Sequence, residues 1–251
     1  MQGRRYALAA GVTLALLAGG SVATMAEPRA VLELFTSQGC SSCPAADKLL
    51  GELARDGSIV ALSLPIDYWD YLGWKDTLAR PRHTARQRSY SAVRGDRQVY
   101  TPQIVVNGSV QALGSDRSAI EDAIDRTQHG AALPVAVAVK PSGSALDVAV
   151  SNKTEQTGEV WLCGIAKAVR VAIGRGENRG HTITYHNVVR RWVKVGELNG
   201  PTKTWSVPRS EIEGEGIDAV AVLVQRSAPK GPGSMLGATI APLHNAALSA
   251  Q

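Results

Sequence analysis

Residues 31–54, VLELFTSQGCSSCPAADKLLGELA, hold a run of strand-forming residues, two closely spaced cysteines and a run with helical spacing. Val31 to Thr36 is rich in residues that favour strands and predicts a strand. From Ala45 to Ala54 the apolar residues recur at the spacing of one helix face, and Gly57 follows where a helix would end. The cysteine pair therefore stands where a strand passes into a helix.

Cys40 and Cys43 are candidates for redox chemistry. Cys40 lies at the expected helix N-terminus, where free backbone N–H groups and the positive end of the helix dipole favour an anion. We therefore expect Cys40 to be the attacking sulfur and Cys43, within the first turn, the resolving one. A Cys-x-x-Cys pair also serves metal sites and inert disulfides, although zinc sites normally bring a second pair or a histidine cluster. We expect no cofactor and no bound metal.

The segment that follows alternates strands and helices. Nearly continuous apolar residues predict a second strand, a polar run with helical spacing predicts a second helix, and Asn107-Gly108 predicts a hairpin turn. Ser115 is the expected cap of a last helix. The remaining predicted elements are strands at 59–66, 103–106 and 110–113 and helices at 77–93 and from 115, the last with Ile120, Ala123 and Ile124 on one face. The order βαβαββα predicts an α/β thioredoxin-like domain over residues 27–132.

Tyr100-Thr101-Pro102-Gln103 directly precedes the predicted hairpin. In thioredoxin-like folds a proline at this place is cis and faces the cysteine pair. We expect Pro102 to take this role and the backbone of Thr101 to pair with an extended substrate segment. An ordinary trans proline at the start of a strand is the alternative.

Four of the eleven Trp and Tyr residues crowd into the loop after the second strand, at Tyr68, Trp69, Tyr71 and Trp74. Such side chains either form a substrate groove beside the thiols or cover the core. Asp67 ends the preceding strand, where it either relays the proton that Cys43 loses or caps the loop. We take Asp67, Tyr68, Trp69 and Trp74 as weaker candidates for substrate binding.

From residue 133 to 251 many short alternating runs, separated by turn residues, predict an all-β sandwich-like domain with a Gly/Pro-rich tail. Cys163 falls in one of these strands and is expected to be a buried small hydrophobe. His186 and Arg190 share a face of another predicted strand and are expected to join a network between the domains. His83, on the polar helix, is expected at the surface.

The N-terminus has the order of a cleaved export signal over residues 1–26, with Arg4 and Arg5, an apolar run and small residues before the cleavage site. The formal net charge is +5, so removing these two arginines leaves +3 (+5 minus 2). This mild charge has no basic block and argues against nucleic-acid binding. We expect a periplasmic or secreted protein with no stable membrane anchor after cleavage.

Four separated motifs resemble one family of bacterial secreted proteins, the domain of unknown function twelve-twenty-three. They are 32–44 (LELFTSQGCSSCP), 67–76 (DYWDYLGWKD), 100–103 (YTPQ) and 185–190 (YHNVVR). The resemblance implies a thioredoxin-like N-terminal part, and Ala45 departs from it where a second proline is expected.

The residues together predict an exported thiol-disulfide oxidoreductase that acts on protein or small-molecule thiols and exchanges electrons with an unknown redox partner. Two alternatives stay open. One is a periplasmic binding protein whose disulfide does not cycle. The other is a Cu(I) metallochaperone, since soft thiolates select that ion.

Overall fold

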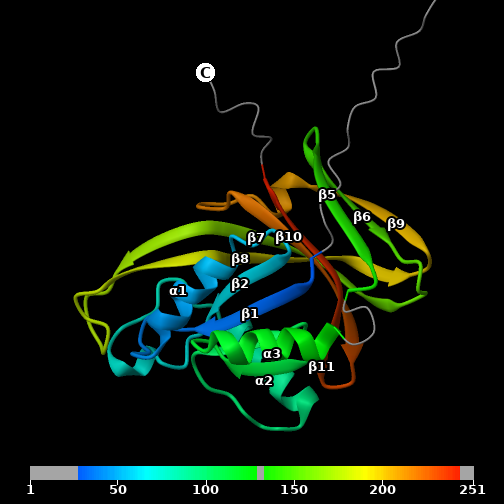
Figure 1. Cartoon of the computed structure of the whole chain (residues 1–251). Helices are drawn as coiled ribbons and strands as arrows, with labels where there is room; N and C mark the ends of the chain where they lie inside the picture. The colour runs from blue at the N-terminus through cyan, green and yellow to red at the C-terminus, as the bar shows by residue number, and fades with distance from the viewer. Residues whose placement is uncertain (1–27, 129–132, 244–251) are drawn as a thin grey trace, which may run out of the picture.

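The computed structural model describes residues 28–128 and 133–243 (Figure 1). The predicted signal segment, residues 1–26, lies outside the described residues. Within the described ranges no helix has both the length and the apolar character needed to cross a membrane.

The first half of the chain has the predicted order of strands and helices. Its elements are β1 (Ala30–Thr36), α1 (Cys43–Leu53), β2 (Ile59–Pro65), α2 (Pro81–Arg94), β3 (Gln103–Val106), β4 (Val110–Leu113) and α3 (Arg117–Gln128), with a short 3-10 turn at Asp70–Leu72. β1 pairs in parallel with β2 and antiparallel with β3. The prediction of a βαβαββα segment is therefore confirmed.

Local sequence explains where these elements begin and end. Prolines near the first position of α1 and α2 lack the N–H that a first turn leaves unpaired. Asn107 and Gly108 both have positive φ, as a tight hairpin turn requires. The cap of α3 differs from the prediction, because the Asp116 carboxylate, and not Ser115, accepts the Ala119 N–H at 3.0 Å.

Alternation along β1 sends its side chains to two cores, one on each face of the sheet. Ala30, Leu32 and Leu34 pack in a cluster with residues of α1 and α3. Val31 and Phe35 pack in a second cluster with Tyr90 of α2. Each face of this strand is thus buried under helix.

The second half is all β in its described part, apart from a 3-10 turn at Arg209–Glu211. Its strands are β5 (Ala136–Ser142), β6 (Ala145–Ser151), β7 (Thr157–Ala172), β8 (Thr182–Asn199), β9 (Thr202–Pro208), β10 (Ala219–Ala228) and β11 (Gly231–Pro242). β7 and β8 are each one long strand where the sequence indicated short runs, and their ladder continues across two register shifts. The Gly/Pro-rich tail, where the sequence allowed a loop or one short strand at Met235 to Ile240, forms β11, which pairs with β10.

The strands form a main mixed sheet of eight, in the order β11-β10-β7-β8-β2-β1-β3-β4, and a small antiparallel sheet of three, β5-β6-β9. The observed strands differ in one respect from the predicted all-β sandwich-like domain. An apolar cluster lies between the small sheet and β7, β8, β10 and β11, but those four strands extend the main sheet. The division at 132/133 adjoins residues 129–132, outside the described residues, and stays a prediction.

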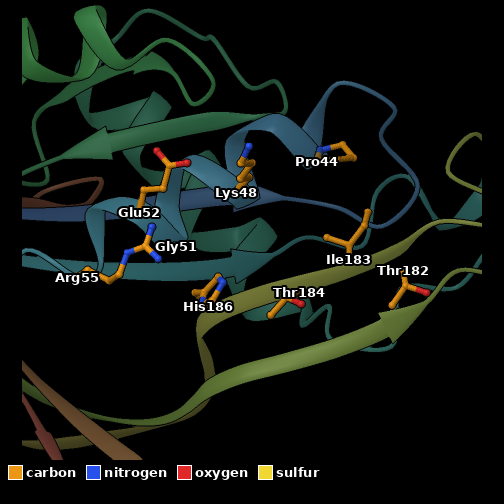
Figure 2. Close-up of a pocket in the computed structure, with 9 residues that line it drawn as sticks. All are labelled: Pro44, Lys48, Gly51, Glu52, Arg55, Thr182, Ile183, Thr184 and His186. Atoms are coloured by element: carbon orange, nitrogen blue, oxygen red, sulfur yellow. The ribbon is translucent and has the colours of Figure 1, made fainter.

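Two of the contacts between the halves show how closely β8 approaches β2 and α1. Ser63 and Val188 form the one residue pair between β2 and β8 in the described chain. His186 of β8 lies against Gly51 of α1 so closely that a Cβ at residue 51 would come within 2.3 Å of the imidazole ring (Figure 2). A glycine is therefore required for this helix to approach β8.

Candidate functional site

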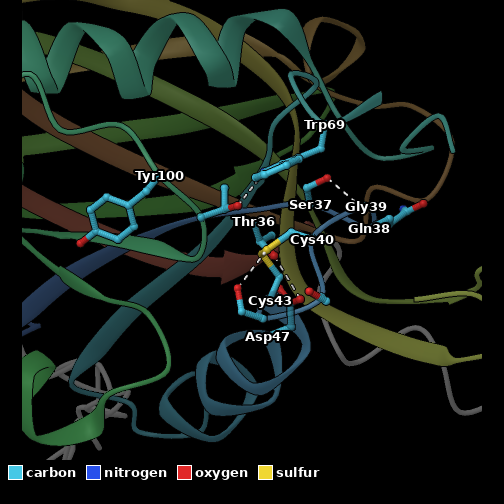
Figure 3. The surroundings of a disulfide bond; sticks show 12 residues. Thr36, Ser37, Gln38, Gly39, Cys40, Cys43, Asp47, Trp69 and Tyr100 are labelled. Atoms are coloured by element: carbon cyan, nitrogen blue, oxygen red, sulfur yellow. Dashed lines mark hydrogen bonds between the residues drawn. A yellow bond between two sulfur atoms is a disulfide. The ribbon is translucent and has the colours of Figure 1, made fainter. Parts of the chain in front are cut away.

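Cys40 and Cys43 form a disulfide between the end of β1 and the start of α1 (Figure 3). Their Cα atoms are 5.4 Å apart. Cys43 is the first residue of α1, and Cys40 lies in the turn before it, where its carbonyl accepts the Cys43 N–H at 3.1 Å. Cys40 is 4% exposed and Cys43 is 0% exposed. The pair is thus closely covered, with Cys40 the less enclosed sulfur.

Asp76 and Trp74, from the loop after β2, hold the turn before the cysteines. The Asp76 carboxylate accepts the Gln38 N–H at 2.8 Å, and the Trp74 indole donates to the Gln38 side chain at 2.8 Å. Asp76 also accepts two N–H groups of its own loop, from Leu78 and Ala79. Burial nevertheless raises the pKa of Asp76 to about 6.

The loop between β7 and β8 covers the cysteine turn from the other half of the chain. The buried Asn178 amide donates to the carbonyls of Gln38 and Cys40, at 2.9 and 2.8 Å. Next to it, the Glu177 carboxylate accepts the Ser41 N–H at 3.1 Å. Sequence reasoning missed both residues, because the contacts join positions 136 to 140 apart in the chain.

Thr101 and Pro102 are connected to the region of the cysteines through Trp69 and α1. The peptide bond between them is cis, as predicted. A Cβ built at Gly114 would be 3.2 Å from side-chain atoms of both Pro102 and Ala46, which places Pro102 at the first turns of α1. The Trp69 indole donates to the Thr101 hydroxyl at 2.8 Å, and Trp69 also lies against Gly39.

The other aromatic side chains of this loop differ in exposure. Tyr68 and Trp69 are partly buried against the core, whereas Tyr71 is 77% exposed and stacks on Trp69. Asp67 accepts the Thr84 hydroxyl of α2 at 2.5 Å. No hydrogen bond between Asp67 and either cysteine is present within residues 28–128 and 133–243, and its proton-relay role stays a prediction.

Asp47 is the buried carboxylate nearest in sequence to the pair, and sequence reasoning missed it. It lies four residues after Cys43, so both belong to one face of α1 (Figure 3). One carboxylate oxygen accepts the Thr36 hydroxyl at 3.1 Å, and the other has no partner among the described residues. Burial raises the pKa of Asp47 well above its usual range. Its signal was a charged residue between Ala46 and Leu50 on the apolar face.

Residues away from the pair resolve two further expectations, on Cys163 and His83. Cys163 is fully buried, as predicted, and burial raises the pKa of its thiol. His83 was expected at the surface but is fully buried, where Nδ1 contacts the Pro65 carbonyl at 2.9 Å. In residues 28–128 and 133–243 no three His, Cys, Asp or Glu side chains gather as a metal site would need.

Comparison with known proteins places the chain in a family. Residues 31–225 match the family described as "Protein of unknown function (DUF1223)". The chain belongs to this family. A crystal structure of an Agrobacterium tumefaciens protein is similar to this DUF1223 chain, with 32% sequence identity and a TM-score of 0.77, over 85% of this chain and 94% of the other. No curated protein matches it.

Proposed function

We propose that this DUF1223 protein is an exported thiol-disulfide oxidoreductase, periplasmic or secreted, whose first half is thioredoxin-like. The observation that carries the proposal is the Cys40–Cys43 disulfide at a strand-to-helix junction, with a buried carboxylate on the same helix. A disulfide with only two residues between its cysteines closes too small a loop to stabilise the fold appreciably. Because the bridge adds little stability, we infer that its function is exchange with other thiols.

The proposed reaction passes two electrons from the Cys40/Cys43 dithiol to a partner disulfide. The Cys40 thiolate attacks one partner sulfur, which breaks the partner's S–S bond and releases the first partner thiolate. The Cys43 thiol then gives up its proton and attacks Cys40 Sγ. The second partner thiolate leaves, and the Cys40–Cys43 disulfide forms again. Run in reverse, the same steps oxidise a partner dithiol.

Cys40 and Cys43 lie in surroundings that suit these different parts. Cys40 precedes α1, whose free N–H groups and dipole favour a thiolate there. Cys43 is fully buried in the first turn, where a thiolate is costly unless its proton has a nearby acceptor. We assign that acceptor to Asp47, which takes the proton on oxidation of the pair and returns it on reduction.

Thr101 and Pro102 are the proposed contact for the partner chain. In this proposal the Thr101 backbone pairs with an extended segment while the mixed disulfide exists, which the Trp69 contact to both Thr101 and Gly39 supports. Trp69, which holds the Thr101 hydroxyl, would position that loop. Tyr68, Trp74 and Asp67 remain weaker candidates for the same surface.

The test is an insulin-reduction assay, together with oxidation of a reduced peptide, on the protein without residues 1–26. Cys40→Ser should abolish both activities, because no mixed disulfide can form. Cys163→Ala is the matched control and should retain them, since that thiol is buried away from the pair. Equal rates for the wild-type protein and Cys40→Ser would contradict the proposal.

A further inference from the structure

One stretch of β8, Thr182–His186, has a strand neighbour on one side. In the described chain β7 is the strand that pairs with these residues. The ladder between β2 and β8 holds one pair, Ser63 with Val188, beside which the Asn187 amide donates to the Ala61 carbonyl at 2.9 Å. A strand directs its backbone N–H and C=O groups alternately to its two sides. Part of the Thr182–His186 backbone therefore points away from β7 and is not paired by β2.

α1 forms a second wall opposite this stretch, and a cavity of about 410 Å³ lies between them (Figure 2). The cavity extends from Pro44, next to Cys43, to Arg55 past the end of the helix. At Gly51 and His186 it adjoins a second cavity of about 490 Å³, which continues past Lys167 to β11. We call the two cavities together the α1–β8 groove.

The groove is cationic. Lys48, Arg55 and Lys167 line it, are exposed, and form no side-chain ion pair within residues 28–128 and 133–243. Glu52 is the one carboxylate in its lining, and Arg117 pairs with it at 2.6 Å. Three cations thus face the groove with no balancing acid, which favours an anionic occupant.

We propose that the α1–β8 groove binds an extended acidic segment of a protein partner, which pairs with the Thr182–His186 backbone and places its carboxylates against Lys48, Arg55 and Lys167. A polypeptide is favoured over other anions because the groove combines unpaired strand backbone with cations. Small apolar residues of the lining, among them Ala54, Ala168 and Ala241, leave room for a main chain.

This site deepens the proposed function and rests on it, since it identifies the partner as a protein with an acidic segment near its exchanging cysteine. Pro44 at one end of the groove directly follows Cys43, and Thr182 follows the loop that holds the Cys40 carbonyl. A segment bound in the groove would therefore begin beside the disulfide.

The test is the binding of a fluorescein-labelled ten-residue peptide rich in Asp and Glu, without cysteine, measured by fluorescence anisotropy. The wild-type protein should bind it more tightly than a Ser/Thr peptide of equal length, and added salt should weaken the binding. Lys48→Glu/Arg55→Glu should weaken it by about tenfold or more, because like charges then face each other. Lys140→Glu/Lys230→Glu, with the same change in net charge at exposed positions of β5 and the β10–β11 turn, should bind like the wild type.

Amide hydrogen exchange tests the strand pairing. The acidic peptide should slow exchange in residues 182–186 of the wild-type protein. Equal binding of the two peptides, unchanged binding by Lys48→Glu/Arg55→Glu, or no added protection at 182–186 would overturn the proposal, as would a single-stranded oligonucleotide that displaces the peptide at equal concentration.

A parallel assay separates this proposal from the proposed function. Lys48→Glu/Arg55→Glu should reduce an uncharged small disulfide at the wild-type rate, since the cysteine pair is untouched. If Cys40→Ser has no effect on that rate while the acidic peptide still binds, the redox function fails and the groove stands. If the redox rate depends on Cys40 but the peptide does not bind, the groove fails alone.

Discussion

Two buried carboxylates lie on opposite faces of β1 and have opposite surroundings. Glu33 and Asp47 are each 1% exposed. Glu33 receives two N–H groups of Arg86, at 2.6 and 3.1 Å, and the hydroxyl of Tyr90. Asp47 receives one hydroxyl, from Thr36, and no cation. The paired carboxylate connects β1 to α2 as part of the architecture, whereas the unpaired one beside a cysteine is suited to carry a proton.

Asp76 stands between these two extremes. It accepts three backbone N–H groups but has no cation, and its pKa is raised to about 6 by burial. The comparison therefore forms a series from Glu33 through Asp76 to Asp47. We expect the loss of stability on removing a partner or a charge to be largest at Glu33 and smallest at Asp47. The loss of redox activity should follow the opposite order.

The largest effect on stability is expected from Arg86→Met. It leaves Glu33 as a buried charge without its cation and should lower the free energy of unfolding by about 3–5 kcal/mol. Urea denaturation measures the loss. Glu33→Gln/Arg86→Met removes the stranded charge as well and should recover part of it. If the double variant were less stable than Arg86→Met, the interpretation of Glu33 as a paired structural charge would be wrong.

Asp76→Asn should change how stability depends on pH. The pKa of Asp76 is raised from its ordinary value of 3.8 to about 6, so the folded protein holds this proton more tightly than the unfolded chain. The wild-type free energy of unfolding should therefore fall by about 2 kcal/mol as pH rises from 4 to 7, through this group alone. The variant lacks this fall. Parallel pH profiles of the two proteins in urea denaturation would exclude the effect.

Asp47→Asn should have the smallest effect on stability and a clear effect on exchange. The variant keeps the shape of the side chain but cannot take the Cys43 proton, so reduction of a partner disulfide should slow by about 100-fold at pH 7. Asp122→Asn, at an exposed position of α3, is the matched control and should keep the wild-type rate, because it lies outside the cysteine site. Stopped-flow kinetics distinguishes the two. Equal slowing in both variants would remove Asp47 from its proposed role.

The sequence predicted the first half well because its signals are local. The apolar spacing around Cys40 and Cys43 specifies the adjoining strand and helix. The turn residues Asn107-Gly108 likewise specify the hairpin that contains them. The predicted cap of α3 was wrong by one residue, since Ser115 and Asp116 are both good capping residues and only the geometry of the turn selects Asp116.

The second half and part of the site depend on contacts that no local pattern carries. β7 and β8 stay paired across two register shifts, and their connecting loop brings Asn178 to the Cys40 carbonyl across 138 positions. The polar residues of α2 predict an exposed His83. In the structure Trp192 of the long strand β8 packs against the His83 ring, and His83 is fully buried. Such burial follows from which strands neighbour one another, which periodicity does not specify.

The most direct measurement of the central claim is the reaction of each single remaining thiol of the pair with a chromogenic aromatic disulfide at pH 7. Reduced Cys43→Ser, which keeps Cys40, should react at least about tenfold faster than reduced Cys40→Ser, which keeps Cys43, because only Cys40 lies before the positive end of α1. Both variants should carry Cys163→Ala so that one thiol is counted. Equal rates, or a faster Cys43, would contradict the assignment of Cys40 as the attacking sulfur.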